Sequence, residues 1–204
     1  MKYYLSSYKF GKESEKLASM APLGEMLYIS NALDITGYDE ERKKNTEQEE
    51  ISTLTQLGLK VEQLDLREYF GEKNRLKQKL VEKKAVFIRG GNVFVLRQAM
   101  NLSGMDEILN DLIENDDFLY SGFSAAGCVL APTLDAYKIV DDSEQLPYQN
   151  STTIMQGLGH TTFCLMPHWD SDHPESKDID KEIEYCIANK ISYKAIRDGE
   201  VLIF

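Results

Sequence analysis

The stretch Leu119-Tyr-Ser-Gly-Phe-Ser124-Ala-Ala-Gly-Cys-Val-Leu130 joins two different patterns. Its start is apolar and aromatic, as in a buried strand, and its end is small and apolar, as in a packed helix. Gly122 precedes Ser124 by two positions, and small residues follow the serine directly. A sharp strand-to-helix turn that lifts a serine above a sheet needs small neighbours of this kind. The stretch predicts a nucleophile elbow, although Ala126 replaces the second glycine of the usual Gly-x-Ser-x-Gly pattern, and a plain Gly-Ser turn is the alternative.

Outward from this stretch, short apolar runs alternate with helical patterns along the whole chain. Several of the runs are continuously apolar, which is typical of parallel strands covered on both faces. The sequence predicts a three-layer α/β/α sandwich with a mostly parallel central sheet. Strands are expected at residues 3–7, 26–30, 60–64, 85–88, 118–120 and 162–166, and helices at 39–57, 72–82, 93–102, 105–114 and 179–188.

The chain of 204 residues has the length of a single α/β domain, and it contains no internal repeat or linker. We therefore expect a single α/β domain over residues 1–204. Residues 194–196 and 200–203 are expected to form a closing hairpin around Asp198-Gly199, a strong turn pair. Residues 132–160 are the least regular part and are a candidate lid.

The composition excludes several classes of protein. Hydrophobic residues make up 42% and charged residues 28%, as in an ordinary folded domain, and the net charge is −11. The sequence has no basic stripe for nucleic acid, and the acidity also disfavours a membrane surface. The start of the chain lacks the apolar segment of a signal peptide, and no apolar run reaches 18 residues. We expect a cytoplasmic protein that acts as a monomer or homodimer on a small substrate.

The cysteines Cys128, Cys164 and Cys186 are odd in number and widely spaced. This argues against a disulfide framework and against a zinc motif. Apolar neighbours surround two of them, so buried free thiols are expected.

A second loop of interest follows the apolar run 85–88 and reads Arg89-Gly90-Gly91-Asn92. Paired glycines let a backbone approach a ligand closely, and the N–H of Gly91 is a candidate oxyanion donor beside that of Ala125. The alternative is a tight turn in which Asn92 caps the next helix.

The chain has three histidines, of which His168 follows Pro167 at the end of an apolar strand. That position predicts the same sheet edge as Ser124, where a histidine can act as general base at neutral pH. His160 precedes the strand and is expected to lie far away. The group Asp170, Asp172, His173 and Glu175 has no spacing typical of a metal motif, so a solvated acidic loop is expected there and no metal site.

A carboxylate that orients the second nitrogen of the histidine completes such a site. The residues alone leave Asp198, Asp141, Asp142 and Asp135 open as candidates, because nothing local to any of them decides the choice.

The ordered set of motifs resembles the peptidase E (aspartyl dipeptidase) family of serine peptidases, with cyanophycinase as a more distant relative. The set is the strand with Gly-Gly-Asn92, then Tyr120-x-Gly-x-Ser124-Ala, then Pro-His168, then the late turn with Asp198-Gly199, over about residues 20–204. The resemblance implies a class I glutamine amidotransferase-like fold, Ser124 as nucleophile, His168 as base and oxyanion donors at Gly91 and Ala125. It favours Asp198 as the third member, although Asp141-Asp142 also matches a family-like acidic position.

The resemblance implies hydrolysis of short peptides without a metal or an organic cofactor. Arg89-Gly-Gly and Ser124-Ala-Ala-Gly depart from the family pattern, so a strict preference for an N-terminal aspartate is not carried over. The alternatives are an esterase or amidase, or a catalytically silent binding protein on the same fold. A glutaminase of this fold would need cysteine at position 124, and Cys128 lies a helical turn too late to replace it.

Overall fold

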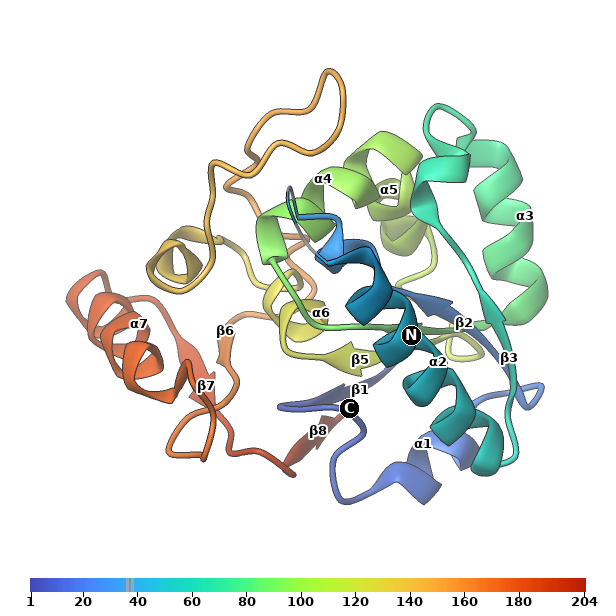
Figure 1. The fold of residues 1–204 in the computed structure, drawn as a ribbon, viewed down its shortest axis with the longest axis horizontal. Coiled ribbons are helices and arrows are strands. Elements are labelled where there is room, and N and C mark those ends of the chain that lie inside the picture. The colour runs from blue at the N-terminus through green and yellow to red at the C-terminus, as the bar shows by residue number, and fades with distance from the viewer. Residues whose placement is uncertain (36, 38) are drawn as a thin grey trace.

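The computed structural model describes residues 1–35, 37 and 39–204 (Figure 1). Its strands are β1 Lys2–Ser6, β2 Glu25–Ile29, β3 Lys60–Gln63, β4 Ala85–Ile88, β5 Leu119–Phe123, β6 Cys164–Met166, β7 Tyr193–Ala195 and β8 Val201–Ile203. Its α-helices are α1 Ser14–Met20, α2 Glu40–Gln56, α3 Lys73–Lys83, α4 Val93–Ser103, α5 Met105–Asp111, α6 Ala125–Cys128 and α7 Ser176–Ala188. Short 3₁₀ turns lie at η1 Asn31–Leu33, η2 Leu66–Tyr69 and η3 Asp135–Ile139.

Six strands form the central sheet in the order β3-β2-β4-β5-β1-β8, and only β8 runs antiparallel to its neighbour. Every residue of β4 and β5 is buried. Alternate residues of β4 enter two separate cores: Val86 and Ile88 pack with α3, α4 and α5, whereas Phe87 packs with residues of α1 and α2 on the other face. Figure 1 shows these helices on opposite sides of the sheet. The predicted three-layer α/β/α fold is confirmed.

The expected hairpin at the end of the chain is wrong. β7 pairs with β6 in a separate two-stranded parallel sheet, whereas β8 pairs with β1 at the edge of the central sheet. The turn at Asp198-Gly199 does form, because the N–H of Glu200 donates to the carbonyl of Arg197 at 2.9 Å. A tight turn reverses the direction of the chain but does not determine which strands the flanking segments pair with. β7 and β8 therefore belong to different sheets. The expected strand at 162–166 is correspondingly shorter and lies outside the central sheet.

The irregular segment expected at 132–160 contains the short 3₁₀ turn η3 and an isolated bridge between Thr133 and Gln156, and otherwise no helix or strand. Its later part is fixed to the domain by backbone hydrogen bonds, from Leu158 to the carbonyl of Val129 and from Thr161 to that of Leu130. A lid function for this segment stays a prediction. The three cysteines are free and buried, as predicted. No helix in the described ranges is both long and apolar enough to cross a bilayer.

Candidate active site

Ser124 occupies the sharp turn between β5 and α6 that the sequence predicted. Its backbone has φ 49° and ψ −112°, a strained combination for a residue with a side chain. The turn is held by hydrogen bonds from the N–H of Gly127 and of Cys128 to the Ser124 carbonyl, at 2.8 and 3.1 Å. A third bond runs from the Ser124 N–H to the carbonyl of Ser6 on β1.

The small residues around the serine are required by close contacts. Gly122 has φ 155°, and a Cβ there would lie 2.2 Å from the carbonyl oxygen of Ile88 and 2.6 Å from Cβ of Ala126. At Gly127 a Cβ would lie 2.3 Å from a methyl carbon of Leu165. The departure from the usual pattern is therefore accommodated, because alanine fits at 126 and the glycine at 127 leaves room for the side chain of Leu165. Burial holds the pKa of the Cys128 thiol well above its ordinary value, so this cysteine is no substitute nucleophile.

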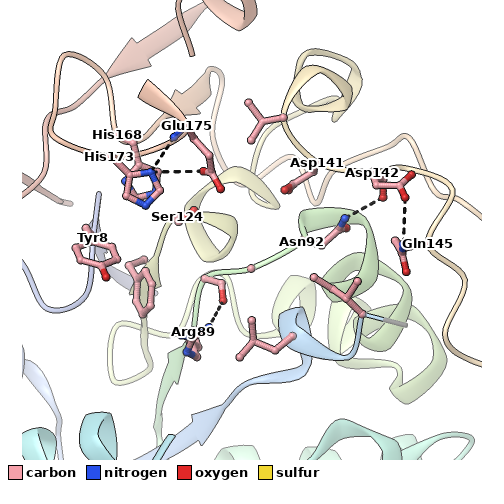
Figure 2. A pocket seen from close by; sticks show the side chains of 16 residues that line it. Tyr8, Arg89, Asn92, Ser124, Asp141, Asp142, Gln145, His168, His173 and Glu175 are labelled. Carbon is pink, nitrogen blue, oxygen red and sulfur yellow. Dashed lines mark hydrogen bonds and ion pairs between the residues drawn. The ribbon is translucent and has the colours of Figure 1, made fainter. Parts of the chain in front are cut away.

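Ser124 opens into a cavity of about 370 Å³ at the carboxyl ends of the parallel strands (Figure 2). Loops from six parts of the chain line it: Tyr8; Leu33 and Ile35; Arg89 to Asn92; Phe123 and Ser124; Val140 to Asp142 with Gln145; and His168, His173 and Glu175. Open α/β sheets hold ligands at this edge.

Gly91 and Ala125 both present N–H groups near the serine that donate to no acceptor in the described residues. Gly91 has φ 149°, and a Cβ there would lie 2.6 Å from the carbonyl oxygen of Ala32, so only glycine fits. Ala125 is the first residue of α6, where N–H groups have no partner inside the helix. Asn92 also caps α4, as the alternative interpretation of this turn predicted. Its Oδ1 accepts hydrogen bonds from the N–H groups of Phe94 and Val95 at 2.9 and 3.0 Å.

His168 is buried, with 2% of its surface exposed, and bonds a carboxylate. Its Nδ1 lies 2.8 Å from Oδ1 of Asp198, the residue that the family resemblance favoured. Ser7 ties this pair together, because its hydroxyl donates to Asp198 at 2.8 Å and accepts the His168 backbone N–H at 2.7 Å. Sequence reasoning missed Ser7, whose only signal was its position at the end of a predicted strand.

The other carboxylates are engaged elsewhere. Asp141 Oδ2 accepts the N–H of Val93 at 2.7 Å, and Asp142 accepts from the N–H of Glu144 and from Gln145. Asp135 is bonded to Thr133 and Lys138. His160 bonds Tyr3 and Asn110 away from the cavity, as expected for a remote histidine. Among the four candidates, the structure brings Asp198 to His168.

The environment of His168 favours its neutral form. Burial lowers the pKa of the imidazole below its ordinary value, and a charge on His173 lowers it further, whereas Asp198 raises it. With the proton on Nδ1 directed at Asp198, the lone pair of Nε2 is free to accept a proton. Ser124 Oγ has no hydrogen bond within the described ranges, so the serine-histidine contact itself is open in this state. Such contacts often tighten when substrate binds.

His173 covers one face of His168, which the sequence did not predict. The two rings stack with centroids 3.7 Å apart at 11°, and the Tyr8 ring meets His168 edge-on at 5.8 Å. The expected solvated loop is correct for Asp170 and Asp172, which are exposed, and wrong for His173 and Glu175, which are half-buried in the cavity. The reason is that the loop after His168 folds back over the imidazole, a long-range packing that acidic composition does not encode.

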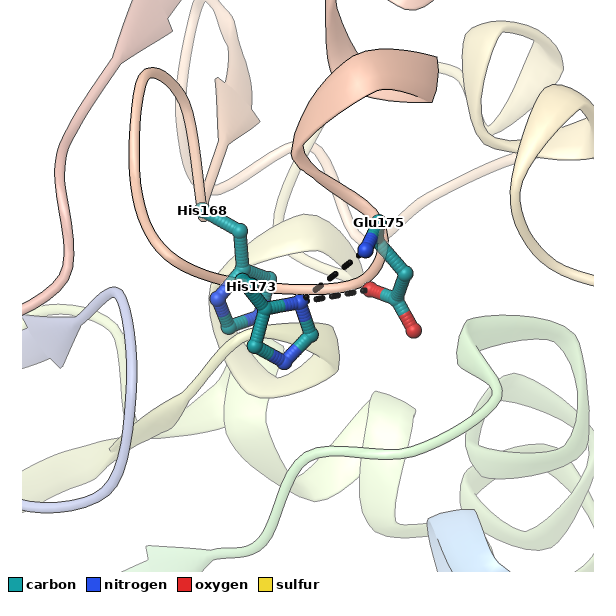
Figure 3. A group of neighbouring side chains, drawn as sticks. All are labelled: His168, His173 and Glu175. Carbon is teal, nitrogen blue, oxygen red and sulfur yellow. Dashed lines mark hydrogen bonds and ion pairs between the residues drawn. The ribbon is translucent and has the colours of Figure 1, made fainter.

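His168, His173 and Glu175 each offer a ligand atom within 4.8 Å of the others (Figure 3). Imidazole lone pairs lie in the ring plane, and the two rings are nearly parallel, so their lone pairs do not converge on one ion. Nδ1 of His173 also accepts the Glu175 N–H at 3.3 Å. This group fits a metal poorly unless one ring turns.

Comparison with known proteins points to one peptidase family. The model of peptidase family S51 matches residues 34–204. An uncharacterized peptidase of Listeria monocytogenes is 27% identical over 174 residues, which are 85% of this chain and 77% of that protein. An uncharacterized peptidase of Pasteurella multocida is 27% identical over 118 residues, or 58% of this chain and 54% of that protein.

Two solved structures share the fold. One, assigned provisionally as a peptidase E of Listeria monocytogenes, has a TM-score of 0.68 at 21% identity and covers 100% of this chain and 97% of that chain. The other, a peptidase from an acI-B1 actinobacterium, has a TM-score of 0.68 at 16% identity and covers 100% and 82%. With the family model over most of its length, this chain belongs to peptidase family S51, the peptidase E family of serine-type peptidases.

Proposed function

We propose that this peptidase hydrolyses short peptides through an acyl-enzyme on Ser124. The observation that carries the proposal is the convergence around one cavity of a strained serine turn, a buried His168 whose Nδ1 is bonded to the partly exposed Asp198, and two backbone N–H groups with no acceptor among the described residues. These are the parts that acyl transfer needs: a nucleophile, an oriented base and donors for the oxyanion.

In the proposed cycle, Ser124 Oγ attacks the peptide carbonyl while His168 Nε2 takes its proton. Asp198 stabilises the imidazolium that forms, because its carboxylate is already bonded to Nδ1. The N–H groups of Gly91 and Ala125 hold the oxyanion, and each such donor contributes about 3–4 kcal/mol in known cases. His168 then protonates the leaving amine, and water repeats the steps on the acyl-enzyme.

A cavity of about 370 Å³ supports a short substrate, and dipeptides, including Asp-X, are the first class to test. The alternatives on the same fold are an esterase or amidase and a binding protein without activity. The open Ser124–His168 contact is what would favour the silent protein.

The deciding experiment is a fluorophosphonate probe together with a panel of dipeptides, esters and amides, on the wild type and Ser124→Ala. We expect Ser124→Ala to lose labelling and to lose hydrolysis by about 10⁴-fold or more, with unchanged thermal unfolding. Ser19→Ala, which removes an exposed hydroxyl on α1, is the control and should retain both. Equal dipeptide hydrolysis by wild type and Ser124→Ala would refute the proposal, and labelling without turnover of any substrate would identify a silent protein.

A further inference from the structure

We propose that a second cavity, between α2 and the carboxyl ends of β2 and β3, binds a free α-amino acid outside the active site. This α2 cavity has a volume of about 360 Å³, close to that of the active-site cavity. Its walls are Ser30 and Asn31 after β2, four charged side chains from the first half of α2, and residues 63–65 and 67. Cavities of this size hold small molecules, and open α/β sheets hold them at this edge.

The α2 cavity and the active-site cavity lie on opposite sides of η1. Ser30 and Asn31 line the α2 cavity, whereas Leu33 and Ile35 line the active-site cavity. The two cavities share no lining residue in the described part of the chain. A ligand in the α2 cavity therefore does not touch Ser124, and its binding does not depend on the proposed peptidase chemistry.

Most of the buried charges around the α2 cavity are paired with one another. Lys43 is bonded to Asp34, and Arg67 donates to Asp65 from Nε at 2.9 Å and from Nη2 at 2.6 Å. Asn31 joins the two pairs, because its Nδ2 donates to Asp34 at 2.8 Å and to Asp65 at 2.9 Å. Each pair is neutral as a whole, so neither requires a charged ligand.

Glu47 is the exception, because its buried carboxyl group has no positive partner. The residue is 7% exposed, and its two oxygens accept hydrogen bonds from the Ser30 hydroxyl and, at 3.0 Å, from Gln63 Nε2. Both donors are neutral, and Lys43, one turn before it on α2, is paired with Asp34 instead. A carboxylate has about four acceptor positions, so two stay open. Because buried charges are normally paired, Glu47 points to a positive group in the cavity.

Two exposed side chains of α2 add one charge of each sign. Glu40 and Lys44 both line the cavity and lie one helical turn apart, yet neither forms a hydrogen bond or an ion pair among the described residues. With the neutral pairs set aside, the α2 cavity presents the carboxylates of Glu47 and Glu40 and the ammonium group of Lys44. Its ligand should therefore carry a positive group and a negative group.

A free α-amino acid matches this arrangement. Its ammonium group donates three hydrogen bonds and suits the open acceptor positions of Glu47, while its carboxylate suits Lys44. Glu47 and Lys44 are three positions apart on α2 and so are neighbours on one face of the helix. A phosphate would place more negative charge against Glu47, and a simple amine would leave Lys44 without a partner. The volume leaves room for the side chain of the amino acid.

The test measures binding of alanine, glutamine and leucine, with their N-acetyl and carboxamide forms, to the Ser124→Ala protein by calorimetry. We expect acetylation and amidation each to weaken binding by about 10-fold or more, the range for a charge-assisted hydrogen bond. Adding Glu47→Gln should remove the effect of acetylation, and adding Lys44→Gln should remove that of amidation. Glu49→Gln and Lys60→Gln make the same charge changes at exposed positions outside the cavity and should bind as the parent does.

Thermal unfolding of each variant separates loss of binding from loss of the fold. Lys44 is exposed, so Lys44→Gln should keep the fold and decide the matter even if Glu47→Gln unfolds. No binding of any free amino acid at millimolar concentration would overturn the inference. Binding that is the same in the parent, Glu47→Gln and Lys44→Gln would also overturn it, because the amino acid would then occupy another site.

Discussion

The two sides of the active site are built by different means. The nucleophile side consists of the turns at 88–92 and 122–127, which follow two central strands and are fixed by backbone contacts that allow only glycine at Gly91 and Gly122. The base side, from β6 to Glu175, lies outside the central sheet. Side-chain hydrogen bonds from Ser7 and Asp198 hold His168 there. Backbone sterics thus shape one side, and a polar side-chain network shapes the other.

After Ser124→Ala, the largest expected effect on activity comes from the base side. Asp198→Asn keeps the size of the side chain but removes the charge and favours the wrong imidazole tautomer, so we expect kcat/KM to fall by about 10⁴-fold with little loss of stability. Steady-state kinetics and thermal unfolding test this together. Asp170→Asn, an exposed carboxylate paired with Arg197, is the control. A variant with nearly full activity would show that Asp198 does not orient His168.

A change on the nucleophile side should instead destabilise the protein. Gly122→Ala introduces a Cβ that overlaps the carbonyl of Ile88, at a φ of 155°, so we expect a loss of about 3 kcal/mol or more in the free energy of unfolding. Gly71→Ala is the matched control, because its φ of 76° is also positive while nothing lies within 4 Å of the new Cβ. Chemical denaturation should give about 1 kcal/mol for the control. Equal losses in the two variants would contradict the contact argument.

The smallest expected effect concerns the histidine stack. His173→Ala uncovers His168 to water and removes a neighbouring charge, and both changes raise the lowered pKa of His168. Since a general base works in its neutral form, the acid limb of the kcat/KM profile should move to higher pH, by less than about one unit. His173→Phe keeps the cover and removes only the charge, so its shift should be smaller. A shift to lower pH in His173→Ala would contradict this reading of the stack.

The nucleophile side was readable from the sequence because its requirements are local. Two strands with plainly apolar sequences lead into Gly122 and Ser124 and into the Gly90-Gly91-Asn92 turn. Gly91 and Gly122 are needed there because a side chain at either position would clash with nearby backbone. The base side was only partly readable. His168 was recognisable from its place at a strand end, but Asp198 could not be separated from three other carboxylates without the family resemblance.

The residues that no local pattern revealed are those whose partners are distant in the sequence. Ser7 is hydrogen-bonded to His168 and Asp198, which lie 161 and 191 positions away in the sequence. Glu182 lines the same small recess beside Ser124 as Asp141 only because α7 packs on η3. The hairpin prediction was wrong for the same reason. The turn at Asp198-Gly199 is local, but the strands on either side of it pair with strands distant in the sequence, in two different sheets.

The amino-acid sequence by itself determined the alternation of strands and helices, the strained serine turn and the glycines beside it. These features depend on hydrophobic periodicity and backbone sterics, which act over only a few residues. The tertiary structure alone decided which carboxylate meets His168, that His173 covers its ring, and that Asp141 and Glu182 meet beside Ser124. These arrangements depend on hydrogen bonds and charges between segments that meet only when the chain is folded, and their energies depend on burial that no local stretch of sequence contains.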